Sequence, residues 1–334
     1  PIMSFSPELV WPVVAKNDLA LDLANSFLIV ASASQATDIQ NDVLAYHYST
    51  DRRPEFCKET AFIKRADGSS IKVACRLLSA VGHDHPQAPV LFRPEKQSDY
   101  TPGTPLSWEF IKTISRDGWQ IEDAVDYFKR YLDILSKLTT TTGERIEIFT
   151  DETKRYVHGK FIDAIPQNII CQPNNVYRLI DREWQGTEDV STARLLFRSM
   201  LWPMFSVSRF GQSSELVNGP LTRKELVVEL FARLGYQEDI NKFSIFQEYE
   251  AKFQQMVTGS TTEEFMQWWP TTILPTENLN LALANRDRQV HHLNLANTER
   301  ATQIHDLNLA LTERNTHIQN LASSINGILN STSW

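Results

Sequence analysis

The sequence predicts an α+β fold with a small antiparallel sheet, a helical region after it, and a long C-terminal coiled-coil helix. Three observations carry this prediction. Two segments of residues that favour β-strands flank an Asp67-Gly68 turn, and this pattern strongly predicts a β-hairpin. Amphipathic helical patterns dominate residues 107–257, and a 14-residue repeat without proline fills residues 279–330.

The composition is that of an ordinary globular protein, with 334 residues, 42% of them hydrophobic and 22% charged. The net charge of -8 argues against a general nucleic-acid-binding protein, which needs a basic face, although a local basic groove stays open. Cys57, Cys75 and Cys171 are widely spaced, which predicts neither a disulfide framework nor a zinc site. With no signal segment and no apolar run near the ~20 residues of a membrane span, we expect a cytoplasmic protein, soluble or peripheral at the inner membrane.

The first segment, residues 1–36, is too short to enclose a core of its own. Its apolar run from Asn25 to Ser32 predicts a buried strand. This run resembles the strand that closes the sheet of class I S-adenosylmethionine-dependent methyltransferases. The glycine-rich loop for S-adenosylmethionine would then lie upstream of Pro1, so we expect the chain to be a fragment of a longer protein and assign no methyl-transfer residues.

Further elements follow in order. Strands are predicted at 43–49, 57–65 and 70–78, and a fourth at 90–93 within a proline-rich stretch. Helices are predicted at 107–114, 121–138, 192–201, 222–234 and 240–257. The second helix carries one apolar face, formed by Ile121, Val125, Phe128, Leu132 and Leu135.

A predicted hairpin between Gly159 and Trp184 contains the candidate site. Two apolar, β-branched runs are joined by a Pro-Asn-Asn turn, and Asp163, Asn168 and Asp181 stand at their ends. Asp163 and Asn168 have the separation found in the kinase catalytic loop, where the aspartate accepts a hydroxyl proton and the asparagine holds magnesium. The three residues form a candidate metal-binding group.

These residues carry a resemblance. Asp163-Ala-Ile-Pro-Gln-Asn168, followed by Leu-Ile-Asp181, resembles the hairpin of aminoglycoside-phosphotransferase-like and lipopolysaccharide kinases. Between a methyltransferase-like tail and a coiled coil, it is similar to the bacterial methyltransferase-kinase proteins that cap O-antigen polysaccharide chains. The resemblance implies a protein-kinase-like two-lobed domain, with an N-lobe at 37–115 and a C-lobe at 116–270.

The resemblance also implies ATP and Mg²⁺ as cofactors, Asp163 as catalytic base, and Asn168 and Asp181 as metal ligands. In a kinase, V-A-I-K on the third strand supplies the lysine that binds the phosphates. Val73-Ala-Cys-Arg76 stands in that place, so the clamp is assigned to Arg76 or to Lys72, which shares its strand face.

The chain departs from the kinase pattern in three ways. The segment 51–56 has no glycine where the nucleotide-covering loop belongs, and Phe161 replaces the usual histidine. The helix glutamate that pairs with the clamp is either Glu95, among prolines, or Glu109, on a predicted helix. We assign Glu109.

Three functions therefore stay open. The first is a kinase that transfers ATP phosphate to the end of a surface polysaccharide. The second is a non-catalytic, pseudokinase-like scaffold within a methyltransferase or glycosyltransferase polypeptide. The third is a substrate-binding extension of the upstream methyltransferase domain.

Some further residues admit two interpretations. His83-Asp84-His85 suggests a metal site or, more simply, a polar loop. Arg52-Arg53 either steers an anion or is a solvated turn. Trp202, Phe205 and Phe210 either line a sugar site or belong to the core.

The coiled coil is predicted over residues 277–331. The a positions fall on Leu283, Val290, Asn297, Ile304, Leu311, Ile318 and Ile325, and the d positions alternate between arginine and an apolar residue. A polar Asn297 at a fixes register, whereas arginine at d leaves the strand number open. We expect a homo-oligomer formed through this helix, with a polysaccharide acceptor and a glycosyltransferase as further partners and no nucleic acid.

Overall fold

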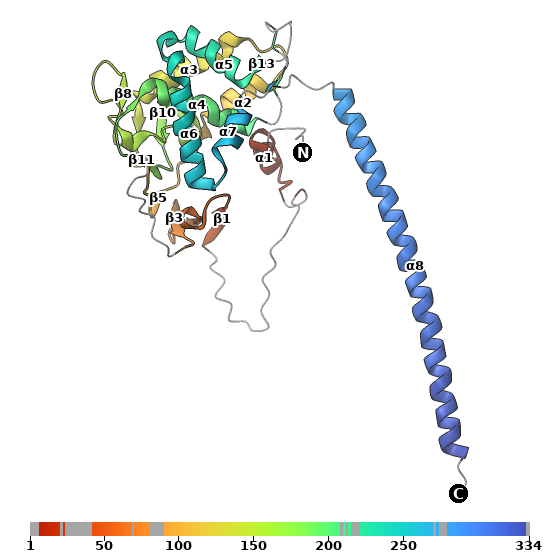
Figure 1. The fold of residues 1–334 in the computed structure, drawn as a ribbon. Coiled ribbons are helices and arrows are strands. Elements are labelled where there is room, and N and C mark those ends of the chain that lie inside the picture. Colours follow the sequence, from red (N-terminus) through yellow and green to blue (C-terminus); the bar gives the residue numbers. More distant parts are fainter. Residues whose placement is uncertain are drawn as a thin grey trace. The chain divides into compact units, whose positions relative to one another are not determined.

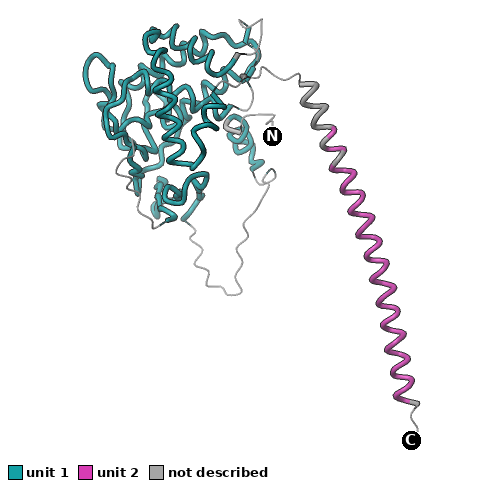
Figure 2. The backbone as a smooth tube through the Cα atoms, in the orientation of Figure 1, with its two compact units in different colours: residues 1–275 teal, residues 276–334 magenta. Residues whose placement is uncertain are grey.

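The computed structural model divides the chain into two compact units, 1–275 and 276–334 (Figure 1, Figure 2). It describes residues 7–20, 23, 42–68, 70–79, 90–207, 210–211, 213–214, 221–269, 272–273 and 279–331. The strand predicted at 25–32 and the His83-Asp84-His85 loop lie outside these residues. Residues 277–331, for which the sequence predicts a coiled coil, fall within the second unit, and residues 37–270 fall within the first.

The first unit begins with helix α1 (Pro7–Lys16) and a small antiparallel sheet in the order β1-β2-β3-β5. The sheet consists of β1 (Val43–Ser49), β2 (Lys58–Lys64), β3 (Ile71–Leu77) and β5 (Gln97–Asp99). Gly68 turns the β2-β3 hairpin with φ 69°, a left-handed conformation that glycine adopts without a steric penalty. The three strands predicted here are confirmed to within one residue at each end.

The fourth predicted strand, at residues 90–93, is present, but it does not belong to the sheet of β1, β2, β3 and β5. β4 (Val90–Phe92) pairs with β11 (Trp184–Gly186) in an antiparallel two-stranded ladder. Phe56, Phe92 and Trp184 pack together there, with ring centroids 4.7 to 5.4 Å apart. Because Phe56 lies two residues before β2, this aromatic cluster ties the small sheet to the segment that follows the candidate site.

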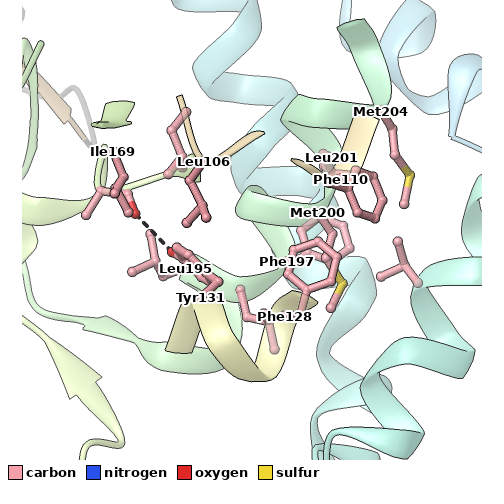
Figure 3. Packing of buried hydrophobic residues seen from close by; sticks show 14 of the residues in the cluster. Leu106, Phe110, Phe128, Tyr131, Ile169, Leu195, Phe197, Met200, Leu201 and Met204 are labelled. Atoms are coloured by element: carbon pink, nitrogen blue, oxygen red, sulfur yellow. Dashed lines mark hydrogen bonds between the residues drawn. The ribbon is translucent and has the colours of Figure 1, made fainter. Parts of the chain in front are cut away.

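Helices α2 (Ser107–Ser115), α3 (Ile121–Leu135) and α4 (Thr192–Ser206) build the main hydrophobic core (Figure 3). On α3, a capping box between Gln120 and Asp123 satisfies the first backbone donors. The predicted apolar face of α3 is buried, with Leu132 partly so. The helix ends three residues earlier than predicted because Leu138 belongs to β7, which pairs with β10.

The predicted hairpin is confirmed. β9 (Ile169–Gln172) and β10 (Val176–Leu179) pair antiparallel within a four-stranded sheet of order β6-β9-β10-β7. The remaining strands are β6 (Thr104–Pro105), β7 (Leu138–Thr139), β8 (Tyr156–Val157), β12 (Val190–Ser191), β13 (Leu221–Thr222) and β14 (Thr272–Ile273). The remaining helices of the unit are α5 (Arg223–Arg233), α6 (Phe243–Thr258) and α7 (Thr262–Trp268), and the 3₁₀ turns are η1 (Pro54–Phe56), η2 (Gly159–Phe161), η3 (Pro166–Asn168), η4 (Pro173–Asn175) and η5 (Gln237–Lys242).

The second unit is one helix, α8 (Leu279–Ser331), of 53 residues. At ~1.5 Å per residue it is ~80 Å long. Its apolar a and d side chains are exposed, as far as the structure describes them: Val290, Leu293, Ile304, Leu307, Leu311, Ile318, Leu321, Ile325 and Ile328. Among the described residues, no helix combines the length and the apolar character that crossing a membrane requires. The mixed α+β class and the long C-terminal helix are thus confirmed.

Candidate functional site

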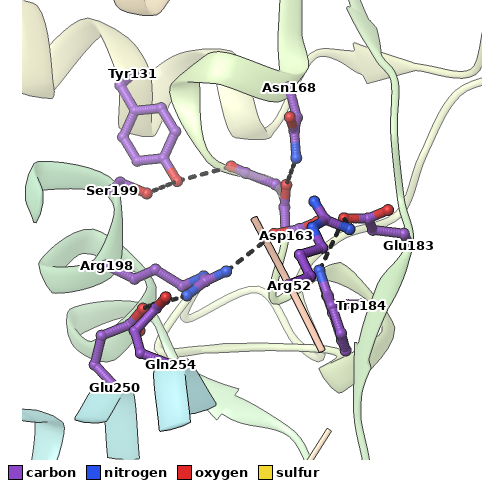
Figure 4. A network of polar contacts seen from close by, with 11 residues as sticks. Arg52, Tyr131, Asp163, Asn168, Glu183, Trp184, Arg198, Ser199, Glu250 and Gln254 are labelled. Carbon is purple, nitrogen blue, oxygen red and sulfur yellow. Dashed lines mark hydrogen bonds and ion pairs between the residues drawn. The ribbon is translucent and has the colours of Figure 1, made fainter. Parts of the chain in front are cut away.

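The loop that carries Asp163 lies between η2 and η3, and two helices hold its backbone (Figure 4). Tyr131 of α3 donates a hydrogen bond of 3.0 Å to the carbonyl of Ala164. Ser199 of α4 donates in turn to the Tyr131 hydroxyl at 2.7 Å. These three buried groups fix the loop directly after Asp163, so the aspartate is presented by a rigid backbone.

A glycine at the start of this loop permits a close approach to the neighbouring chain. A Cβ atom on Gly159 would stand 2.2 Å from the Glu188 carbonyl oxygen and 2.6 Å from that of Gly186. Both contacts involve backbone atoms, so any larger residue would force the loop away from β11. Position 159 is therefore restricted to glycine by packing.

Asn168 is oriented by the same loop. Its side-chain nitrogen donates to the backbone carbonyl of Asp163 at 3.0 Å. This bond uses the NH₂ group of the amide, which leaves its carbonyl oxygen free to accept or to bind a cation. The orientation suits an asparagine that ligates magnesium.

The carboxylate of Asp163 is buried and contacts a buried arginine. Arg198, only 4% exposed on α4, places one nitrogen 3.2 Å from Asp163 and another 2.6 Å from Glu250. Burial raises the pKa of Asp163 to about 7, and the Arg198 charge only partly opposes this effect. Burial alone would lower the pKa of Arg198, but the two carboxylates outweigh it and raise that pKa.

A second charged cluster joins the small sheet to the segment after β10. The Lys58 ammonium lies 2.8 Å from Asp181 and 2.5 Å from Glu183. Arg52 approaches the other oxygen of Glu183 at 2.7 Å, and Trp184 donates its indole N–H to the same oxygen. Burial would lower the pKa of Lys58, but the charges of Asp181 and Glu183 raise it overall.

Asp181 differs from Glu183 in the exposure of its side chain and has an unusual backbone conformation. Its side chain is 48% exposed, whereas Glu183 is buried. Its φ of 48° lies in the left-handed region, which is uncommon for residues other than glycine and which aspartate tolerates better than most. A strained backbone that presents an accessible carboxylate is typical of binding sites.

One pocket of about 510 Å³ is lined by side chains of both clusters, including Arg52, Glu183 and Arg198 but not Lys58. The predicted residues Asp163, Asn168 and Asp181 all line it. The structure therefore assembles the three residues that the sequence singled out, in a space large enough for a small ligand.

The residues predicted as the phosphate clamp and its glutamate partner, Arg76, Lys72 and Glu109, do not line this pocket. In the antiparallel pairing of β2 with β3, Lys58 is the partner of Leu77 and Glu59 is the partner of Arg76. Paired residues point to the same side of the sheet and successive residues to opposite sides, so Lys58 and Arg76 lie on opposite sides. Arg76 is 68% exposed and pairs with Glu59 at 3.0 Å.

Lys72 shares the face of Arg76, and it lines a different hollow, beside Asp99 and Thr141. Glu109 is on α2, as predicted, but it pairs with Arg130 of α3 at 2.5 Å. None of these side chains lines the pocket of Asp163, because strand alternation and helix packing direct them away from it.

The sequence interpretation missed Lys58, Glu183 and Arg198. A signal existed for Arg198, a charged residue inside the apolar run Leu195-Leu-Phe-Arg-Ser-Met-Leu201. Such a residue needs a buried partner. Asp181-Arg-Glu183 likewise offered a second carboxylate close to the first. No local signal distinguished Lys58 from other strand lysines.

A magnesium ion can be tested against these donors. The described residues contain no group of three or more His, Cys, Asp and Glu side chains that could hold a metal by themselves. Asn168 and Asp181 offer one amide oxygen and one carboxylate, which suits Mg²⁺ because this ion takes few protein ligands and completes its shell with water and phosphate oxygens. The donor set fits a magnesium ion that arrives with a nucleotide.

Comparison of the chain with protein-family models, with curated proteins and with solved structures found no match.

Proposed function

We propose that the pocket catalyses phosphoryl transfer from ATP with Mg²⁺ to a hydroxyl at the end of a surface glycan, on a kinase-like two-lobed framework. Bound Mg²⁺ would supply charge neutralisation on the phosphates, held by Asn168 and Asp181. Asp163 would accept the hydroxyl proton. A base with a pKa of about 7 is well matched to this task near neutral pH.

The observation that carries the proposal is the position of Lys58. It comes from the small sheet, yet it is buried against Asp181, more than a hundred residues later in the chain. A lysine beside the candidate metal ligand supports a role in binding a nucleotide phosphate, because charge-assisted contacts to phosphate are strong. The cluster of Arg52, Lys58, Asp181 and Glu183 is balanced in charge, with two cationic and two anionic side chains.

Removing Lys58 tests this role. Mg²⁺ with ATP is expected to raise the melting temperature of the full chain by several degrees, as ligands that bind only the folded state do. Lys58→Met is expected to weaken nucleotide binding at least about 10-fold because a charge-assisted contact is lost. Titration by thermal shift and calorimetry measures both effects.

Lys72→Met is the matched control, since Lys72 is on the opposite face of the same sheet. It should leave nucleotide binding unchanged. Failure of the unmodified protein to bind Mg²⁺ with ATP, under conditions that give a clean melt, would sink the phosphotransferase proposal.

A second candidate function is a non-catalytic scaffold. The ion pairs from Lys58 to both Asp181 and Glu183 favour it, because they neutralise the carboxylate that would hold the metal. The glycine-free segment 51–56 also favours it. Phosphate transfer to any acceptor that disappears in Asp163→Asn would exclude this alternative.

The exposed apolar stripe of α8 supports a homo-oligomer formed through the coiled coil. Ile304 and Leu307 belong to it and are more than half exposed. The double substitution Ile304→Asp with Leu307→Asp places charges in the seam and should shift the sedimentation coefficient to that of the monomer. The control is Arg288→Asp at an f position, outside the seam, and an unmodified chain that is monomeric at micromolar concentration would contradict the prediction.

A further inference from the structure

We propose that Trp202, Phe205 and Gln167 form a subsite for a neutral sugar ring beside Asp163. The binding itself does not depend on phosphoryl transfer. Only the statement that this sugar is the acceptor rests on the proposed function.

An aromatic wall forms one end of the pocket. Trp202 and Phe205, both on α4, line the pocket, with ring centroids 5.7 Å apart. Phe205 is stacked on Trp268 of α7 with a centroid distance of 3.8 Å and an interplanar angle of 10°. Phe205 nevertheless remains 43% exposed. A fixed aromatic surface that stays accessible suits the apolar C–H face of a pyranose ring.

Unpaired polar atoms accompany this wall. Within the described part of the chain, the side-chain nitrogen and oxygen of Gln167 and the indole nitrogen of Trp202 are buried and have no hydrogen-bond partner. A buried polar group left without a partner costs about 1–3 kcal/mol, so native proteins retain few of them. Both residues line the same pocket, so a ligand there lies beside the two side chains that carry these atoms.

The donors and acceptors match hydroxyl groups. The amide of Gln167 both donates and accepts, and the indole N–H of Trp202 only donates. A hydroxyl can take either role, so neighbouring hydroxyls of one ring can pair with both side chains. The combination of aromatic rings and uncharged polar atoms therefore favours a polyol over a nucleobase or a lipid.

The charge next to the wall favours a neutral ring. The Arg198 guanidinium lies 5.3 Å from the Trp202 ring centroid and 4.5 Å from that of Phe253. These rings already interact with a cation, so a ligand ammonium would have to compete with Arg198 for them. A neutral ring needs no such exchange.

The subsite adjoins the base. Gln167 belongs to η3, which directly follows the loop of Asp163, and Trp202 follows Arg198 by one turn of α4, on the same helix face. Because Arg198 contacts Asp163, a ring lying on Trp202 can present a hydroxyl to the Asp163 carboxylate. The subsite thus supplies the positioning that the base requires.

The test uses the full chain with methyl α-D-glucopyranoside, methyl α-D-mannopyranoside and methyl α-D-galactopyranoside. Saturation-transfer NMR and titration at millimolar concentration are expected to show saturable binding of at least one of them. Gln167→Leu removes hydrogen-bonding atoms while keeping bulk, Trp202→Phe removes the indole N–H while keeping an aromatic ring, and each should weaken binding at least about 3-fold. Gln267→Leu, on the exposed surface of α7, should have no effect.

A stability measurement separates a binding role from a structural one. Since the Gln167 amide makes no hydrogen bond, Gln167→Leu should leave the melting temperature unchanged or raise it. A clear fall in melting temperature would overturn the assignment. So would the absence of saturable glycoside binding, binding unaffected by both pocket substitutions, or preference for the cationic probes choline and kanamycin.

Nucleotide binding is measured on the same samples. Glycoside binding without binding of Mg²⁺ and ATP supports the subsite and removes the phosphotransferase proposal. Nucleotide binding without glycoside binding overturns the subsite and leaves the phosphotransferase proposal standing. Pocket variants that lose glycoside binding but keep nucleotide binding support the subsite as a separate part of the pocket.

Discussion

Arg198→Met is expected to lower the free energy of unfolding by about 3–5 kcal/mol, the typical cost of removing one partner from a buried ion pair. Arg198 is buried between Asp163 and Glu250. Methionine keeps much of the apolar stem of the side chain but leaves two carboxylates without their shared cation. Urea denaturation at pH 7.5 measures the change.

Two comparisons make this prediction specific. Arg130→Met breaks the exposed pair with Glu109 and should cost at most about 1 kcal/mol. Adding Glu250→Gln to Arg198→Met should recover part of the loss, because one of the uncompensated charges is removed. A loss below about 1 kcal/mol in Arg198→Met would show that the carboxylates find other compensation.

The local elements of the fold were predictable because local patterns determine them. The Asp67-Gly68 turn, the β-rich runs on either side and the apolar face of α3 each depend on residues that are close in sequence. The hairpin with Asp163, Asn168 and Asp181 is of the same kind, since turn chemistry and strand alternation bring its ends together. These three residues line one pocket, as the sequence suggested.

The rest of the site depends on contacts between distant segments. The pairing of Lys58 with Asp181 spans 123 positions, and Arg198 joins Asp163 and Glu250 across 35 and 52 positions. Strand periodicity predicts that Lys72 and Arg76 share a face, but it does not say which face meets the pocket. The packing of β4 on β11 and of Phe56 on Trp184 decides that question. Lys72 and Arg76, the residues predicted as the clamp, therefore lie on the face opposite to Lys58, which contacts Asp181.

A distinct pH dependence is expected from Asp163. Its pKa is raised from an ordinary value near 4 to about 7 in the folded protein. Between these values the folded chain holds a proton that the unfolded chain has released. The contribution of Asp163 to stability is therefore fully present below about pH 4 and is lost as the pH rises towards 7.

Asp163→Asn removes this titration while keeping the shape of the side chain and an oxygen that can accept from Arg198. We compare the free energy of unfolding of the variant with that of the unmodified chain. The difference, variant minus unmodified chain, is expected to increase by about 2–4 kcal/mol from pH 4.5 to pH 8. Denaturation at several pH values measures the difference, in which the titrations common to both proteins cancel.

The sign of the Asp163→Asn result decides between two states of the candidate base. A difference that grows with pH means that burial outweighs the Arg198 charge, so that Asp163 exchanges its proton near neutral pH, as a general base must. A constant or falling difference means that Arg198 keeps the carboxylate ionised throughout. Asp163 and Arg198 would then form a permanent ion pair, which fits a scaffold better than a phosphotransferase.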